Sequence, residues 1–265
     1  PYELISISPW VRRKLVTAAY RHGRIFLAGD CAHQNTPTGG YGMNTGMGDA
    51  VDLGWKLAAA VQGWAGPALL DSYDAERRPV ALHNVEEATR NFHLRSFPAI
   101  PGLLEDSARG EFARGRLGDE IVRNTARELV SDGIVMGYRY HGSPVVCPDG
   151  SEPPPQLVTE YVQSTFPGAR APHAWLGGGR STLDLFGKAF VLLRLGRDAQ
   201  AVAPLAQAAT RCKVPLQTVA LDEPAVRGAY ERELVLVRPD GHVAWRGDVV
   251  PADADAIVAQ VTGSH

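Results

Sequence analysis

The spacing of apolar residues predicts two long helices in the first part of the chain. Asn44 or Thr45 could cap the first helix, and Gly66-Pro67 would stop it. The apolar residues at helical spacing, which predict its buried face, are Met47, Ala50, Val51, Gly54, Leu57, Ala58 and Val61. A second helix is expected over residues 67–94, with a kink or a restart at Pro79. The segment SFPAIPG then breaks the pattern.

A short apolar run and a glycine-rich loop precede these helices. Residues 23–30, GRIFLAGD, predict a strand buried on both faces, because such strands lose their alternation. Seven glycines lie between Gly29 and Ala59. A strand, a glycine-rich turn and a helix N-terminus expose backbone N–H groups to an anion or to a planar ligand. The same glycines could also simply turn the chain. Neither GxGxxG nor GxxxxGK[ST] is present.

The second half of the chain has a different pattern. Residues 111–130 predict a polar helix whose apolar stripe is Ile121, Val122, Leu129 and Val130. The Pro- and Gly-rich residues 148–155 predict a linker. Two strands with a helix between them, a hairpin around Pro-Asp-Gly and a closing helix follow. This order is typical of a thioredoxin-like α/β module. The module lacks CxxC, so we expect no thiol–disulfide chemistry there.

Composition and charge narrow the function classes. The chain carries 27 basic and 29 acidic residues, a net charge of −2, so no basic footprint for a nucleic acid is expected. Its apolar runs are too short to span a membrane, and no signal-peptide pattern opens it. The cysteines Cys31, Cys147 and Cys212 are odd in number and widely spaced. They predict reduced thiols in a cytoplasmic protein, as small core or partly buried side chains.

Motifs along most of the chain carry a family resemblance. Residues 23–59 contain G-D-x-A-H, P-T-G-G, G-M-N and D-x-x-x-L-x-W-K-L-A in order. This segment resembles the second FAD motif of the group A flavoprotein monooxygenases, the para-hydroxybenzoate hydroxylase family. The segments GARAPHAWL, STLDLFG, FVLL and LVLVRPDGHVAWRG resemble the thioredoxin-like C-terminal domain of phenol hydroxylases and natural-product tailoring enzymes. The indolocarbazole-pathway monooxygenases show the closest resemblance, followed by aromatic polyketide hydroxylases.

The resemblance implies an α/β fold in three parts. Residues 1–110 would be the C-terminal part of a Rossmann-like FAD-binding domain with long helices. Residues 111–155 would form a helical connection and linker, and residues 156–265 a thioredoxin-like domain lacking CxxC. The family's GxGxxG, its Asp-Gly motif and its substrate-binding sheet have no counterpart in this sequence. We therefore expect a C-terminal half whose partner is the N-terminal half of the same protein, with residues 1–10 as the last strand leaving the substrate domain.

The resemblance also implies which residues bind the cofactor. Asp30 would hydrogen-bond the ribityl chain of FAD, and Pro37 would lie beside the flavin. Gly42, Met43 and Asn44 would present backbone N–H groups to the flavin ring. A helix starting at Asn44 would then point its positive end at the N1–C2=O edge, an effect of roughly 0.3–2 kcal/mol on reduced flavin.

The catalytic pocket implied by the resemblance lies on the same loop. Pro37 would stand on the edge of the flavin where oxygen reacts. Thr38, Gly39 and Gly40 would leave room there for O2 and for the substrate ring. No residue of the sequence is predicted to bind a metal, because the histidines lack ligand spacing.

Charged residues near the loop are expected to be structural. His33 is predicted to support the loop rather than to act as an acid or base, and Asp49 and Asp52 to complement the helix dipole. Residues 76–78, Glu-Arg-Arg, predict a salt-bridged surface.

The activity implied by the resemblance is that of an FAD-dependent monooxygenase. NAD(P)H would reduce FAD, and a flavin C4a-hydroperoxide formed with O2 would hydroxylate an aromatic, polycyclic natural product. The 265-residue chain alone is expected to bind FAD weakly and to be inactive. A homodimer is left open. Two alternatives stand beside this hypothesis: a non-catalytic thioredoxin-like interaction module, and a flavoenzyme of the same fold that performs Baeyer–Villiger oxygenation.

Overall fold

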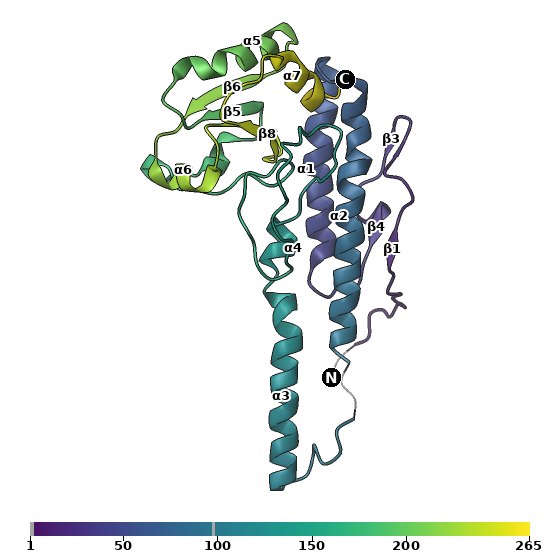
Figure 1. The fold of residues 1–265 in the computed structure, drawn as a ribbon. Coiled ribbons are helices and arrows are strands. Elements are labelled where there is room, and N and C mark those ends of the chain that lie inside the picture. The colour runs from purple at the N-terminus through teal and green to yellow at the C-terminus, as the bar shows by residue number, and fades with distance from the viewer. Residues whose placement is uncertain (1–2, 97–98) are drawn as a thin grey trace.

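Two long antiparallel helices form the axis of the molecule (Figure 1). The computed structural model describes residues 3–96 and 99–265. Helix α1 covers Tyr41–Gln62 and helix α2 covers Pro67–Leu94, and the two lie side by side. The predicted bounds of α2 are confirmed, and the helix continues through Pro79 without a restart. Part of the predicted break after α2 lies outside the described residues.

The start of α1 differs from its prediction. The helix begins at Tyr41, with Gly40 as its N-cap at φ 66°. Asn44 and Thr45 therefore lie inside the first turn and do not cap it. Their side chains donate backward instead, from Asn44 Nδ2 to the Gly40 carbonyl (2.9 Å) and from Thr45 Oγ1 to the Tyr41 carbonyl (2.7 Å). Gly63, in the left-handed region at φ 80°, ends the helix before the predicted stop.

The buried face of α1 is also not the predicted one. All seven residues of the predicted apolar stripe are exposed, and Val61 is 87% exposed. The face toward α2 carries Asp49, Asp52 and Lys56, which are fully buried. The helix packs by ion pairs on this polar face, so apolar periodicity alone selected the wrong side.

Short strands and a 3-10 turn precede α1. β1 (Leu15–Val16) pairs with β4 (His33–Gln34), and β2 (Arg21–His22) pairs with β3 (Ile25–Phe26), both antiparallel. The predicted buried strand over residues 23–30 is wrong. Its only strand is the two-residue β3, and Ile25 is 64% exposed. The chain turns at Gly29, φ 64°, into the 3-10 helix Gly29–Cys31. The expected strand over residues 1–10 is absent from its described residues, 3–10.

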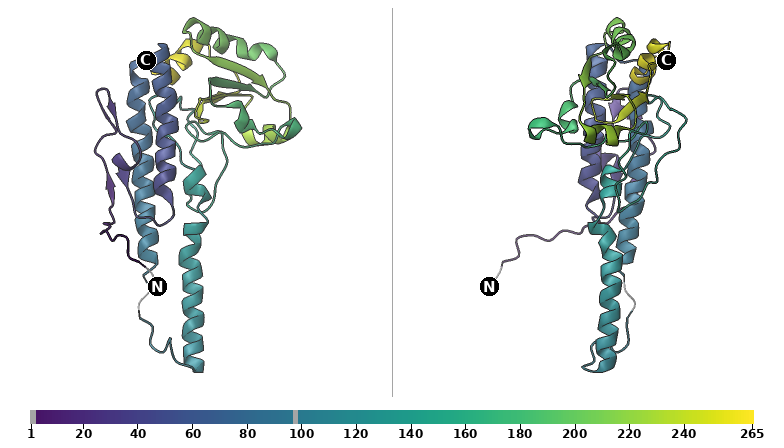
Figure 2. Two further views of the ribbon diagram at one scale, coloured as in Figure 1. Left: turned by 180° about the vertical axis from the view of Figure 1, so that it is seen from behind. Right: turned by 60° about the vertical axis from the view of Figure 1, so that its left-hand side comes forward.

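The last turns of a third long helix lie beside the end of α2, and the rest of this helix extends past it (Figures 1 and 2). Helix α3 covers Ala108–Leu129, and the short α4 covers Asp132–Met136. The predicted apolar stripe of α3 is not buried, since Val122 is 69% and Leu129 is 83% exposed. Ion pairs hold the end of α3 to α2 instead, Arg127 to Glu87 and Arg95 to Glu128.

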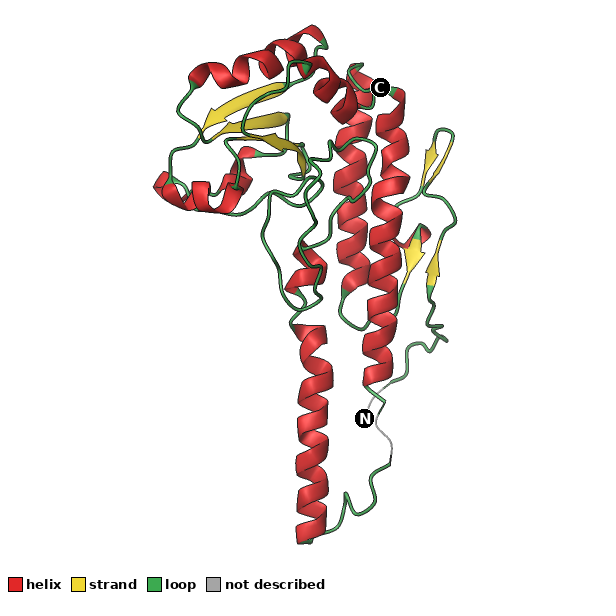
Figure 3. Cartoon of the chain, in the orientation of Figure 1, coloured by secondary structure: helices red, strands yellow, loops and turns green. Residues whose placement is uncertain are grey.

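The C-terminal part is a four-stranded sheet flanked by helices (Figure 3). Its strand order is β6-β5-β7-β8, with β5 and β6 parallel and the other pairs antiparallel. This is the arrangement of a thioredoxin-like module. The strands are β5 (Phe190–Arg194), β6 (Leu216–Ala220), β7 (Leu234–Val237) and β8 (Val243–Gly247). The helices are α5 (Ala203–Arg211), α6 (Pro224–Tyr230) and α7 (Ala254–Thr262), and 3-10 turns cover Gly177–Gly179, Thr182–Leu185 and Ala199–Val202.

The sheet is buried on both faces, and one face extends the core into the helical pair. Phe190 and Leu192 face a cluster with α5 and α7, while Val191 and Leu193 face a cluster with α6. The first cluster also contains Trp55, Ala59 and Leu69 of α1 and α2. The module and the helical pair therefore share one hydrophobic core.

Two further contacts fix the module in place. The N–H of Gly66 donates to the Thr262 carbonyl at 2.8 Å, and the N–H of Ala68 donates to the Gly263 carbonyl at 3.1 Å. The predicted linker is also tied down, because Asp149 forms an ion pair with Arg246 of β8 at 2.7 Å. Within the described part of the chain, no helix has both the length and the apolar character needed to cross a membrane.

The three thiols are free, as predicted, but their environments differ. Cys31 and Cys212 are exposed, contrary to the expected burial, and Cys147 is half-buried. Burial raises the pKa of the Cys147 thiol to about 12. Its thiolate fraction at pH 8 is therefore roughly a thousandfold below that of an ordinary thiol. We expect iodoacetamide to modify two cysteines of the native protein quickly and Cys147 only after denaturation, as measured by peptide mass spectrometry. Rapid native labelling of Cys147 would contradict this environment.

Candidate functional site

The glycine-rich loop, residues 29–44, forms one wall of an open hollow. The hollow measures about 730 Å³, within the size range of ligand sites. Five of the residues that sequence analysis assigned to the cofactor or to catalysis line it: Asp30, Pro37, Gly40, Gly42 and Met43. Residues that sequence analysis did not single out complete the wall: Trp10, Val11, Arg13, Gln34, Asn35 and Thr36.

Free backbone donors stand at this wall. Because α1 begins at Tyr41, the N–H groups of Tyr41, Gly42 and Met43 have no intrahelical acceptor. They also carry the positive end of the helix dipole. The N–H groups that lack an intrahelical acceptor thus begin at Tyr41, whereas sequence analysis placed the first of them at Gly42. The N–H of Asn44 has an acceptor within the helix, so it is not available to a ligand. A side chain at Gly42 would crowd Asn35, since a Cβ there would lie 3.1 Å from Asn35 Oδ1. The wall can therefore hold a flat acceptor-bearing ring against bare backbone.

Three predicted site residues do not reach the hollow. Thr38 is buried, and its hydroxyl pairs with Thr36 Oγ1 at 2.7 Å. Gly39 lies behind the wall at φ 90°, with its N–H donating to Glu128 Oε1 at 2.9 Å. A Cβ there would lie 2.5 Å from the Tyr41 ring. The side chain of Asn44 is used within the first turn of α1. Thr38 and Gly39 therefore shape the wall from behind.

Three buried side chains, the loop anchor, hold the loop to the helices. They are His33, Asp49 and Arg77. Asp49 Oδ2 accepts from the Gly29 N–H (3.0 Å) and lies 3.1 Å from His33 Nε2. Asp49 Oδ1 accepts from Arg77 Nε at 2.9 Å. Burial opposes ionisation of Asp49, but the His33 hydrogen bond and the Arg77 charge outweigh it and lower its pKa. The structural role predicted for His33 and Asp49 agrees with these contacts. The predicted dipole role of Asp49 and Asp52 is wrong, because both lie beyond the first turn of α1 and form buried ion pairs instead.

The loop anchor requires glycine at two positions of α1, where a side chain would collide with its neighbours. A Cβ on Gly48 would lie 2.6 Å from Arg77 Nη2, which donates to the Thr45 carbonyl at 3.0 Å. A Cβ on Gly46 would lie 3.1 Å from the Gly29 Cα. The loop and the first turns of α1 therefore touch backbone to backbone, with the guanidinium against them.

A second set of buried charges, the ionic cluster, joins the helices to the module. Its members are Asp52, Lys56, Glu76, Arg238 and Asp240. Lys56 Nζ donates to Asp52 Oδ2 (2.7 Å) and to Glu76 Oε2 (2.6 Å). Arg238, on the turn between β7 and β8, donates to Glu76 Oε1 (2.6 Å) and to Asp52 Oδ1 (2.9 Å). The predicted salt-bridged surface at residues 76–78 is therefore wrong for Glu76 and Arg77, which are about 1% exposed.

The carboxyl groups of the ionic cluster have opposed proton affinities. Burial would raise the pKa of Glu76, but Arg238 and Lys56 outweigh it and lower it to about 2. For Asp240 the Arg238 charge likewise outweighs burial and holds the pKa well below its usual range. For Asp52 burial prevails over the attraction of Lys56, and its pKa lies well above the usual range. Asp52 is therefore the first of these three carboxyls to take up a proton.

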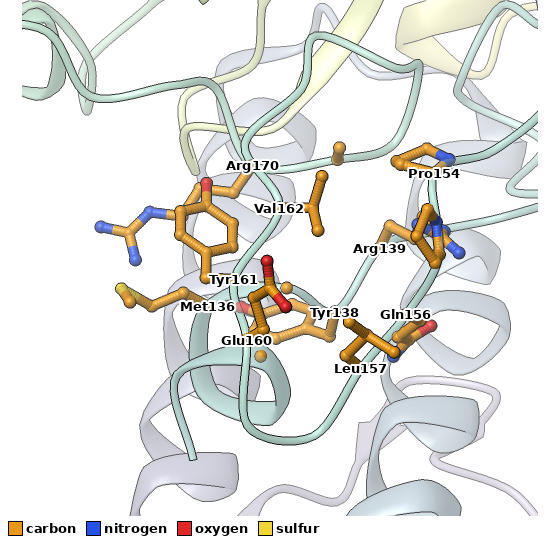
Figure 4. Close-up of a pocket in the computed structure, with 14 residues that line it drawn as sticks. Met136, Tyr138, Arg139, Pro154, Gln156, Leu157, Glu160, Tyr161, Val162 and Arg170 are labelled. Carbon is orange, nitrogen blue, oxygen red and sulfur yellow. The ribbon is translucent and has the colours of Figure 1, made fainter. Parts of the chain in front are cut away.

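A smaller hollow beside α4 is not a substrate site (Figure 4). It lies between the facing segments 136–139 and 154–162. Its volume of about 10 Å³ admits a single water molecule. In the described ranges, 3–96 and 99–265, no group of His, Cys, Asp and Glu side chains could hold a metal ion. The glycine-rich loop is thus the candidate site.

Comparison with known proteins gives matches to both parts of the chain. Residues 1–88 match the FAD binding domain family, and residues 164–264 match the aromatic-ring hydroxylase C-terminal family. The FAD-dependent monooxygenase apdD of Emericella nidulans is 39% identical, over 98% of this chain and 44% of its own length. The structure of the rebeccamycin biosynthetic enzyme RebC with reduced flavin is 47% identical with a TM-score of 0.85, over 94% of this chain and 47% of that one. The flavin-dependent monooxygenase PieE in complex with FAD and substrate is 32% identical with a TM-score of 0.83, over 94% of this chain and 49% of that one.

The two matched regions, the sheet topology and the loop place the chain in one class of proteins, the flavoprotein hydroxylases with a thioredoxin-like C-terminal module. The chain belongs to the family of FAD-dependent aromatic-ring hydroxylases. It spans about half the length of the curated relatives and solved structures that it matches. The resemblance found in its motifs is thereby confirmed.

Proposed function

We propose that this chain forms the flavin-ring side of an FAD-dependent aromatic monooxygenase. The free N–H groups of residues 41–43, at a bare glycine wall, carry the proposal. Bound FAD would supply the redox chemistry, because it can accept electrons from NAD(P)H and then react with O2. The residues of the chain would bind and orient the ring and exclude water from it. Relatives named as a putative polyketide hydroxylase and as an aklavinone-11 hydroxylase in complex with aklavinone support a polycyclic aromatic substrate. They do not favour the interaction-module or Baeyer–Villiger alternatives.

Each wall residue would have a distinct role in this site. Asp30 is exposed at the hollow and would accept from the ribityl hydroxyls. Pro37 and Gly40 would shape the space beside the ring where O2 and substrate enter, backed by Thr38 and Gly39. The N–H groups at Gly42 and Met43 would donate to the carbonyl edge of the ring. The positive end of α1 would there stabilise the negative charge of reduced flavin.

Replacing Asp30 by alanine is expected to weaken FAD binding about 10- to 100-fold, because a hydrogen bond to a charged group is lost. Quenching of FAD fluorescence on titration into the protein that carries residues 1–265 measures the affinity. Asp106→Ala is the matched control, since Asp106 is exposed and far along the chain from the hollow. Unchanged affinity in Asp30→Ala would remove Asp30 from the site. Absence of FAD binding in the unmodified protein would overturn the proposed function.

We also propose that the partner of this chain is the N-terminal half of the same protein. The exposed apolar stripe of α1, including Met47, Val51 and Val61, and the exposed Ile5 and Trp10 support it. Apolar patches of this kind mark interaction surfaces. On this proposal residues 1–265 alone bind FAD weakly, and tight binding by them alone would contradict it.

The domain division, the localisation and the oligomeric state are also proposals. We divide the chain into residues 1–110, 111–155 and 156–265, although the shared core makes them one packed body. Three free thiols support a cytoplasmic protein. Light scattering distinguishes a monomer from a homodimer.

A further inference from the structure

The thioredoxin-like module reaches the glycine-rich loop through a path of buried hydrogen bonds, ion pairs and one cation–π contact. We propose that Arg238 of this module is a positioning residue for the loop. It would act through Glu76 and Tyr140 on Arg77 and Asp49. This inference rests on the proposed function only where FAD affinity is the readout, because the contacts themselves lie within this chain.

The first part of the path is the insertion of Arg238 between the helices. Its guanidinium is fully buried, and Nη1 and Nη2 donate to the two oxygens of Glu76 at 2.6 and 2.9 Å. Nη2 also donates to Asp52 at 2.9 Å, so one side chain of the module holds α1 and α2 together. A planar guanidinium has the fork of donors that fits both oxygens of Glu76 at once, and an ammonium has no such fork.

The second part of the path runs through Tyr140 and the residue next to Glu76. The guanidinium of Arg238 lies 4.9 Å from the centre of the Tyr140 ring. The hydroxyl of Tyr140 accepts from Arg77 Nη1 at 3.4 Å. His242, the other buried end of the β7–β8 turn, packs on the same ring at 4.3 Å. The turn thus packs on the Tyr140 ring, and Arg77 contacts its hydroxyl.

The last part of the path is the loop anchor. Arg77 holds Asp49, and Asp49 accepts the N–H of Gly29, the residue before Asp30. Asp49 and Asp52 lie one turn apart on α1, and Glu76 and Arg77 are adjacent on α2. A shift of α1 against α2 at the ionic cluster would therefore move the acceptor of the Gly29 N–H. Tightly packed cores transmit such shifts because they have little free volume.

Hydrogen exchange of the loop tests this path without reference to activity. The protein that carries residues 1–265 is compared with Arg238→Lys, which keeps the buried positive charge but not the three-way hydrogen bonding. We expect deuterium uptake over residues 27–35 to become at least about twofold faster, and FAD affinity to fall roughly 3- to 30-fold, the range of measured coupling between sites. Arg211→Lys is the matched control, since Arg211 of the same module pairs with Asp255 at the exposed surface.

Two outcomes overturn the proposal. If Arg238→Lys folds and its deuterium uptake over residues 27–35 is unchanged, Arg238 does not position the loop, even if uptake in β7 and β8 rises. Should this variant not fold, the same criterion applies to Tyr140→Phe, which removes only the hydroxyl that Arg77 contacts. Faster loop exchange in a protein that binds no FAD with or without the substitution would instead sustain the positioning role and overturn the proposed function.

Discussion

Replacing Glu76 by leucine should lower the free energy of unfolding by about 3–5 kcal/mol, the usual cost of breaking a buried ion pair on one side. The carboxylate is about 1% exposed and accepts from Lys56, Arg238 and Ser143. Its loss leaves two buried cations with too few partners. Denaturant unfolding at neutral pH, followed by circular dichroism, measures the change.

Ionisation of Asp52 can reduce the stability loss in Glu76→Leu, which explains the lower end of the range of about 3–5 kcal/mol. Repulsion from Glu76 helps to raise the pKa of Asp52, after the larger effect of burial. In Glu76→Leu this repulsion is gone, so Asp52 ionises more readily and partly compensates Lys56 and Arg238. The double variant with Asp52→Asn lacks this compensation. It should be less stable than Glu76→Leu alone.

The pH dependence has a definite sign. The pKa of Glu76 is lowered from 4.5 to about 2 in the folded protein. A depressed carboxyl pKa stabilises fully above the unfolded value and stops stabilising as the pH falls through the folded value. With Asp52→Asn in both proteins, which removes the second titration, the stability gap between Glu76 and Glu76→Leu should therefore be constant well above pH 4.5 and shrink toward pH 2.

The control for Glu76→Leu lies on the same helix. Glu86 pairs with Lys14 at the exposed surface, so Glu86→Leu should leave the unfolding midpoint essentially unchanged. Equal effects of Glu76→Leu and Glu86→Leu, or a gap that widens in acid, would contradict the buried cluster.

These buried charges are also where sequence reasoning was least successful. The β5 and β7 segments were predictable, because strands buried on both faces read as continuous apolar runs. The same reasoning misplaced residues 23–30, which the left-handed Gly29 turns away from a strand. Charge spacing was the neglected signal: Asp52 and Lys56 are four apart on one helix, the spacing of an ion pair. Arg238, which pairs with Asp52 and Glu76, is 186 and 162 residues away from them, and no local pattern could have indicated it.

The loop shows a similar division between what could and could not be predicted. The motifs placed Asp30, Pro37, Gly40, Gly42 and Met43, and the structure brings these five to one hollow. They could not show that Thr38 points inward or that α1 starts at Tyr41. Both depend on contacts with α2 and α3, such as Thr38 Oγ1 to the Ala88 carbonyl and Gly39 N–H to Glu128.

Replacing Gly263 by alanine should lower the free energy of unfolding by about 2–5 kcal/mol, the sum of a left-handed backbone cost and overpacking. Gly263 ends α7 at φ 70°, and a Cβ there would lie 2.2 Å from the Leu69 nitrogen. The obstacle is backbone of α2, which cannot rotate away as a side chain could. Gly66 faces it with the same restriction, since its Cβ would lie 2.2 Å from the Gly263 carbonyl oxygen. The module docks on α2 through this glycine pair.

The variant Gly63→Ala distinguishes the cost of the left-handed backbone from the cost of overpacking. It ends α1 at φ 80° with the same backbone geometry, but a Cβ there would meet nothing within 4 Å. Gly63→Ala should therefore cost only the conformational part, about 1–2 kcal/mol. The difference between the two variants measures the contact between the module and α2. Gly263→Ala should weaken the packing of the thioredoxin-like module on α2. Thermal unfolding of this variant should therefore show two transitions, whereas the wild-type protein and Gly63→Ala should each show one. Equal destabilisation by both substitutions, each with a single transition, would mean that the module does not depend on this contact for its place on α2.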